Sequence, residues 1–185
     1  MNYHEISGLA GLNIFTDLQH LNIGILYGLS HEFEFMHLFF NITRLHLRFK
    51  SMTSQVVRIF SCFPNLLNLH VEELSLAFSL PQIIAAIANL KKLKQVAITI
   101  NSLHRPFIGE TMLQCSNLNM IKIGCFNQIC AVTLINQAID IIGQAEQRML
   151  ELELKCSDVI TENFQIPTNL KLKLINVNKS NLLLL

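Results

Sequence analysis

The chain has 185 residues, of which 51% are hydrophobic and 15% charged, and its formal net charge at pH 7 is +1. It is long enough for one ordinary domain and too apolar for a disordered chain, which combines low hydrophobicity with high net charge. A nearly neutral chain produces no global field that would attract nucleic acid, so a charged contact with a partner must come from a local patch.

Apolar residues occur in short clusters, and no run reaches the roughly 18 residues that indicate a membrane span. The first residues, Met1–Glu5, lack the basic start and apolar run of a signal peptide. The five cysteines are odd in number and contain no C-x-x-C pair, which favours reduced thiols over a disulfide framework. These features predict a cytoplasmic or nuclear protein that contacts no membrane.

A pattern of apolar-x-x-apolar-x-apolar recurs along the chain. Its first positions are Leu18, Ile42, Leu66, Leu93, Leu118, Met149 and, more weakly, Asn169. The last two apolar positions of each motif are two residues apart, so their side chains point to one face of a strand. The pattern predicts parallel strands centred near residues 21–23, 45–47, 69–71, 96–98, 121–123, 152–154 and 172–174.

Parallel strands need a crossover of a dozen or more residues, and the segments between the motifs have room for one. Apolar residues at helical spacing predict helices over residues 82–90, which Ser79 and Pro81 precede, and over residues 132–147. Less regular patterns predict shorter helices over residues 32–40, 55–62, 109–115 and 159–164.

The motif and its mean spacing of about 25 residues resemble leucine-rich repeats, whose period is about 20–29 residues. The resemblance implies an α/β leucine-rich-repeat solenoid of about seven irregular repeats, with a parallel sheet on the concave side and helices on the convex side. Residues 1–185 would form a single domain, with 1–17 as an N-terminal cap or partial repeat and 179–185 as a C-terminal tail. Because the tail ends in Leu182–Leu185, we expect it to pack against the last helix, to mediate dimerisation or to continue into further chain.

The stretches Cys62–Val71 and Gln114–Ile121 resemble repeats of F-box/leucine-rich-repeat proteins. In those proteins the repeats hold the substrate of a ubiquitin ligase, while the F-box binds a Skp-type adaptor. Residues 1–15 are too short for an F-box, so such an adaptor would bind only if an F-box lies outside this chain. The resemblance implies a protein-binding module, as the substrate-recognition part of an SCF-type ubiquitin ligase. The alternative is a free-standing scaffold or inhibitor with no role in ubiquitination.

No motif of catalysis or cofactor binding is present, because the glycines form no phosphate-binding loop and neither G-x-S-x-G nor H-E-x-x-H occurs. Cys125-x4-Cys130 departs from zinc-finger spacing, and buried single cysteines are the simpler interpretation. His46 and His70 occupy the same outward position in consecutive repeats. A metal or catalytic pair is one interpretation, and two solvated histidines are the simpler one. The sequence therefore predicts no enzyme, no cofactor and no metal site.

Side chains that alternate with the apolar positions point to the opposite face of each strand, which repeat solenoids use for binding. The predicted protein-binding residues on this face are Arg44, His46, Arg48, Asn68, His70, Glu72, Gln95, Lys122, Glu151, Glu153, Lys171 and Lys173. Strands in register would place Glu151 beside Lys171 and Glu153 beside Lys173.

Basic residues dominate one corner of this face. Arg44 and Arg48 lie on one predicted strand. The one carboxylate expected near them on this face is Glu72, beside Arg48. Arg44 is left unpaired, and a guanidinium suits a bidentate contact with carboxylate or phosphate. We therefore expect this corner to bind an acidic or phosphorylated segment of another protein. The run Lys91-Lys92-x-Lys94 is interpreted as a solvated helix end, and no nucleic-acid partner is expected.

Overall fold

The computed structural model of the chain describes residues 18–26, 40–49, 60–73, 85–100, 113, 115–125, 128–145 and 147–177. It shows an α/β protein with seven strands, all parallel, that follow one another in chain order. All seven strands lie where the motifs predict them. The chain divides into two compact units, residues 1–94 and residues 95–185, which carry three and four of the strands.

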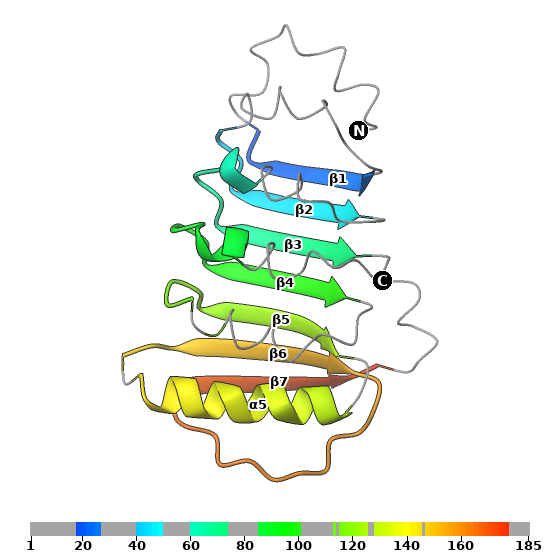
Figure 1. Ribbon diagram of the computed structural model, residues 1–185, viewed down its shortest axis with the longest axis vertical. Coiled ribbons are helices and arrows are strands. Elements are labelled where there is room, and N and C mark those ends of the chain that lie inside the picture. The colour runs from blue at the N-terminus through cyan, green and yellow to red at the C-terminus, as the bar shows by residue number, and fades with distance from the viewer. Residues whose placement is uncertain are drawn as a thin grey trace, which may run out of the picture. The chain divides into compact units, whose positions relative to one another are not determined.

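The first unit contains β1 (His20–Leu26), β2 (Arg44–Phe49) and β3 (Asn68–Glu73). β1 pairs with β2 and β2 pairs with β3, in both cases parallel, and the three strands lie side by side in Figure 1. The apolar motif positions of β2 and β3 all point into the core. They are Leu45, Leu47, Leu69 and Val71, and each is buried. Full burial of one such side chain stabilises the fold by about 1.5–3 kcal/mol.

The turns that lead into β2 and β3 repeat the same hydrogen bonds. The amides of Thr43 and Arg44 both donate to the carbonyl of Gln19, at 2.9 and 3.0 Å. One motif period later, the amides of Leu67 and Asn68 both donate to the carbonyl of Thr43, each at 2.9 Å. Equivalent positions of successive motifs therefore adopt the same local structure.

The second unit contains the four remaining strands and a long helix. The strands are β4 (Gln95–Ile100), β5 (Met120–Cys125), β6 (Leu150–Cys156) and β7 (Leu170–Asn176), and the helix is α5 (Gln128–Gly143). β4 pairs with β5, β5 with β6 and β6 with β7, all parallel. In Figure 1 α5 runs alongside β6 and β7, which it also contacts.

Residues at helical spacing form the buried stripe of α5: Cys130, Ala131, Leu134, Ile135, Ala138 and Ile142. The helix begins where the amide of Gln128 donates to Asp158 Oδ2 at 3.1 Å. It ends where the side-chain amide of Asn169 donates to the carbonyls of Ile142 and Ala145, at 2.8 and 3.0 Å. The helix predicted over residues 132–147 therefore exists but lies nearer the N-terminus, because residues distant in the chain cap both of its ends.

The helix predicted over residues 159–164 is wrong, because this segment has no regular secondary structure. The β6–β7 connection has to run the length of α5, from Asp158 at the start of the helix to Asn169 at its end. A helix of 16 residues is about 24 Å long, and the 11 steps from Asp158 to Asn169 would rise only about 16 Å as a helix. An extended path spans the distance.

The other predicted helices are described only in part. Residues 85–88 form one helical turn within the predicted helix 82–90, and residues 60 and 61 are helical near the end of 55–62. Most of 32–40 and 109–115 lies outside the described residues, as do residues 1–17 and 179–185.

Candidate functional site

The open face of β2 and β3 carries the polar side chains that the alternation predicts. The six predicted binding residues of the first unit all lie on it: Arg44, His46, Arg48, Asn68, His70 and Glu72. In register, His46 lies beside His70 and Arg48 beside Glu72. The structure therefore brings these residues together, as strands paired one motif period apart require.

Glu72 is the centre of this group, and only 6% of the residue is exposed. Arg48 Nε donates to its Oε2 at 2.7 Å. The Nε2 atoms of His46 and His70 lie 3.1 and 3.7 Å from its Oε1. From the sequence we expect Glu72 to lie on an open face and to pair only with Arg48. Long side chains at facing and diagonal positions of the sheet instead converge over the carboxylate and bury it.

The imidazole rings of His46 and His70 are stacked, with centroids 4.2 Å apart and planes inclined by 8°. The parallel ladder brings them this close, because neighbouring strands lie about 4.8 Å apart. Their side chains remain 28% and 40% exposed, respectively, while they pack on each other beside Glu72. His46 Nε2 is buried and has no hydrogen-bond partner among the described residues, although Glu72 Oε1 lies within ion-pair distance.

Arg44 stands apart from this cluster. Its side chain is exposed and makes no ion pair or hydrogen bond with any residue that the structure describes. Its register partners are His20 on β1 and Asn68 on β3. Neither partner is a carboxylate, so the guanidinium charge of Arg44 is not neutralised by a facing residue.

Glu153 is the centre of the open face in the second unit. It is 4% exposed, and the Nζ atoms of Lys173 and Lys122 lie 2.9 and 3.5 Å from its Oε2. Burial acts to raise the pKa of Glu153, but the hydrogen bond from Lys173 and the charges of Lys122 and Lys173 together outweigh it and lower the pKa. The hydrogen bond to Glu153 in turn raises the pKa of Lys173. Glu153 and Lys173 are therefore both charged at neutral pH.

Glu151 and Lys171 form a second pair on this face, with 3.2 Å between Oε2 and Nζ. The register of β6 and β7 is the one that the sequence predicts. Gln95 lies at the start of β4, where it is exposed and faces Met120 on β5. Each of the two carboxylates therefore has a lysine beside it, which neutralises its negative charge within the sheet.

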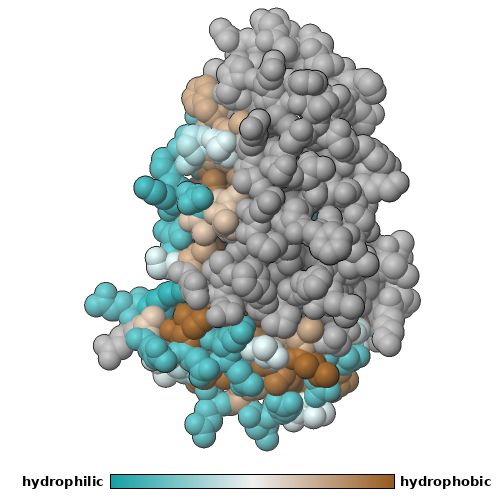
Figure 2. All heavy atoms as spheres, in the orientation of Figure 1, coloured by the Kyte–Doolittle hydropathy of each residue, from teal (hydrophilic) through white to brown (hydrophobic). Residues whose placement is uncertain are grey.

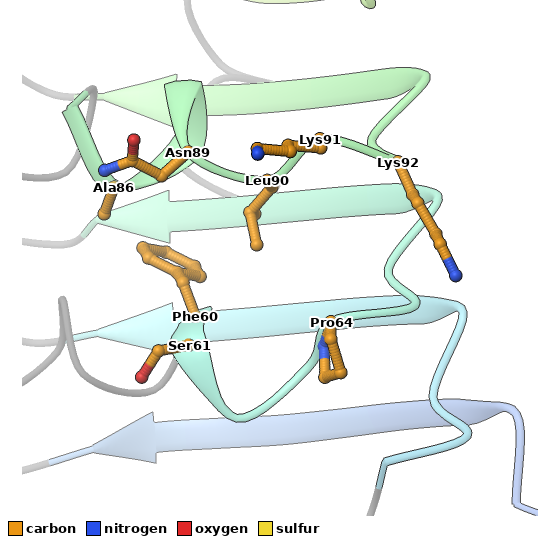
Figure 3. Close-up of a pocket in the computed structure, with 8 residues that line it drawn as sticks. All are labelled: Phe60, Ser61, Pro64, Ala86, Asn89, Leu90, Lys91 and Lys92. Carbon is orange, nitrogen blue, oxygen red and sulfur yellow. The ribbon is translucent and has the colours of Figure 1, made fainter.

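A pocket of about 570 Å³ opens between two successive strand connections of the first unit. Phe60 and Leu90 line it, and Figure 3 shows their side chains extending toward each other while Lys92 extends away from Leu90. Lys92 Nζ donates to Asn65 Oδ1 at 2.6 Å and so joins the two connections. None of the predicted binding residues lines this pocket.

Three polar residues link successive connections, a role that the sequence pattern did not assign to them. Besides Lys92, Asn65 Nδ2 donates to the carbonyl of Phe40 at 3.1 Å, and Arg148 donates to the carbonyls of Leu113 and Cys115. Asn65, Lys92 and Arg148 each directly precede the first apolar position of a motif. That shared position is the signal that could have found them.

Burial raises the pKa of the thiols of Cys62, Cys115 and Cys156. These groups therefore stay protonated at neutral pH, where a thiol is a poor nucleophile. Together with Cys130 they are free thiols, as the odd cysteine number favours.

Hydrophobic side chains also reach the surface of the second unit. Figure 2 shows them gathered over the lower part of the molecule, where α5 lies in Figure 1. Among the described residues of this unit, the exposed large apolar side chains are Ile129, Met149, Val159, Ile166 and Leu174. Within the described part of the chain, no helix combines the length and apolar character needed to cross a membrane.

No protein family, curated protein or solved structure matches this chain. Function is therefore inferred from the geometry of the open face.

Proposed function

We propose that the chain is a leucine-rich-repeat solenoid that binds another protein through the open face of its strands and catalyses no reaction. Two features support the repeat. The strands are parallel and follow chain order, and the paired hydrogen bonds to Gln19 recur one motif later at Thr43. Such a stack presents one side chain of each strand beside the equivalent side chain of the next, which makes an extended binding surface.

The binding proposal depends above all on Arg44, whose guanidinium is exposed and has no carboxylate facing it in register. Arg48 forms an ion pair with Glu72. Arg44, by contrast, is exposed, and its neighbours in register are His20 and Asn68. These neighbours offer hydrogen-bonding groups and no carboxylate. An exposed guanidinium flanked in this way suits a carboxylate or phosphate group, which it contacts through two parallel hydrogen bonds. The partner is therefore an acidic or phosphorylated segment of a protein.

The test measures the fluorescence anisotropy of labelled peptides: one rich in glutamate, one carrying phosphoserine and its unphosphorylated counterpart. Arg44→Glu should weaken binding of an anionic peptide at least about tenfold, as loss of a central arginine contact does. The matched control is Lys91→Glu with Lys92→Glu, which changes charge away from the open face and should leave affinity unchanged. Arg48 is left intact because its removal would also strip Glu72 of a partner.

Preference for the phosphoserine or the glutamate peptide identifies the anionic group. Equal losses in the Arg44 and the lysine variants would reduce the effect to general charge attraction. Unchanged binding after Arg44→Glu would refute this corner as the site.

The resemblance of residues 62–71 and 114–121 to F-box/leucine-rich-repeat proteins supports a narrower version of the proposal. In it, the chain is the substrate-recognition part of an SCF-type ubiquitin ligase, and the alternative is a scaffold or inhibitor outside that pathway. Co-purification of a Skp-type adaptor with the full-length protein favours the ligase. A bound partner without the adaptor favours the scaffold.

A further inference from the structure

We propose that His46, His70 and Glu72 bind a divalent transition-metal ion of the Zn²⁺ class. The inference is independent of partner binding. The sequence predicts no metal site, because it indicates two solvated histidines and a carboxylate engaged only by Arg48. The structure places the three potential ligand atoms within 4.8 Å of one another.

The spacing of the ligand atoms suits a single ion. In a tetrahedral site with metal–ligand distances of about 2.0–2.1 Å, neighbouring ligand atoms lie about 3.3 Å apart. Glu72 Oε1 lies 3.1 Å from His46 Nε2 and 3.7 Å from His70 Nε2. Because the two rings are stacked nearly parallel, they have to turn out of that stack for both nitrogens and the oxygen to coordinate one centre.

The donor set suits this class of ion. Two imidazole nitrogens and one carboxylate oxygen are ligands that Zn²⁺ takes in three-residue sites, where water fills the fourth position. Both rings present Nε2 to Glu72 because the ladder stacks them, with centroids 4.2 Å apart. His70 remains partly exposed, which leaves a route from solvent to the site.

An unsatisfied atom also points to a cation at this place. His46 Nε2 is buried without a hydrogen-bond partner among the described residues, yet it lies 3.1 Å from a carboxylate oxygen. When neutral and unprotonated at this atom, the imidazole turns a lone pair toward the lone pairs of Glu72, which is unfavourable. An ion between the two atoms converts that contact into two coordinate bonds.

Arg48 positions the carboxylate. Its Nε holds Glu72 Oε2 at 2.7 Å and leaves Oε1 directed at the two histidines. Contacts of this kind to a ligand strengthen metal sites about 10- to 100-fold by fixing its orientation. The positive charge of Arg48 opposes that of the ion, so we expect a site of moderate affinity, below that of structural zinc sites.

The first test uses the unaltered full chain and Zn²⁺ alone. Nitrogen-15 spectra of the histidine rings, recorded during a Zn²⁺ titration, should show the Nε2 signals of two histidines shifting together at one ion per chain. His20, exposed on β1, should not shift. Zn²⁺ binding with no histidine signal moving would assign the ion to the thiols and overturn the proposal. Absence of any binding at millimolar Zn²⁺ would also overturn it.

The second test compares variants by calorimetric titration, with circular dichroism to check that each is folded. His46→Ala and His70→Ala should each weaken Zn²⁺ binding at least about tenfold. The matched control, His20→Ala, removes a histidine from the same face and should change nothing. Unchanged affinity in the variant lacking both His46 and His70 would refute the site. Should these variants fail to fold, the spectra of the unaltered chain still decide the question.

Discussion

Glu72 and Glu153 are the two charged residues that are buried within the described part of the chain. Burial of an ionised carboxylate without partners costs several kcal/mol. Each carboxylate lies where strands in register supply cations: Arg48 reaches Glu72, and Lys122 and Lys173 reach Glu153. The stability of the fold therefore depends on the ion pairs of these two carboxylates, although the alternation of the strands predicts both of them on the exposed face.

At this scale we predict that Glu153→Gln destabilises the fold at neutral pH. The folded pKa of Glu153 is lowered, so its ionised form stabilises the fold above the ordinary carboxylate pKa. That stabilisation is lost as the pH falls through the lower folded value. Urea unfolding from neutral to acid pH should therefore show a deficit for Glu153→Gln that disappears in acid.

Glu151→Gln is the matched control for this prediction. Glu151 also pairs with one lysine, but its side chain is 24% exposed against 5% for Glu153. Water screens an exposed pair, so the control should lose less stability. A deficit for Glu153→Gln that persists undiminished in acid would contradict the electrostatic explanation.

At the scale of elements, α5 and the β6–β7 connection depend on each other. The carboxylate of Asp158 caps the first turn of the helix by accepting from the amide of Gln128. At the other end, the side-chain amide of Asn169 donates to the carbonyls of Ile142 and Ala145. The helix has no acidic residue in its first turn and no basic residue in its last. Its ends are therefore satisfied by the connection rather than by its own sequence.

We predict that Asp158→Ala lowers the free energy of unfolding by about 1 kcal/mol, the usual cost of removing a capping carboxylate. The first-turn amide of Gln128 would then lose its partner. Glu162→Ala, in an exposed part of the same connection, is the control and should change the free energy by less than about 0.5 kcal/mol. Equal effects of the two substitutions in urea unfolding would argue against the cap.

At the scale of the whole molecule, the described strand positions of the apolar motif are buried in β1 to β6 but not in β7. Leu152 on β6 is 1% exposed, whereas Leu174 on β7 is 43% exposed. Leu152 and Leu174 belong to the same apolar face of the repeat, so the sequence pattern assigns them the same role. In the structure their burial differs, because less of the described chain covers β7 than β6.

Alanine substitutions should reveal this difference. Leu152→Ala should cost about 2–5 kcal/mol, because it removes a fully buried side chain and leaves a cavity. Leu174→Ala should cost less than about 1 kcal/mol, because much of the side chain already contacts water. Denaturant unfolding of both variants measures the two costs. A loss at Leu174 as large as that at Leu152 would mean that β7 is covered in solution.

The sequence by itself determined the seven strands, their parallel register and the polar character of the open face. A side-chain period of two separates the faces, and a motif that recurs at similar spacing aligns Glu153 with Lys173 and His46 with His70. Only the tertiary structure decided that Glu72 is buried beneath three side chains and that Asp158 and Asn169 cap α5. It also decided that residues 159–164 run without a helix. These features depend on distances between residues far apart in the chain, and a local period carries no information about such distances.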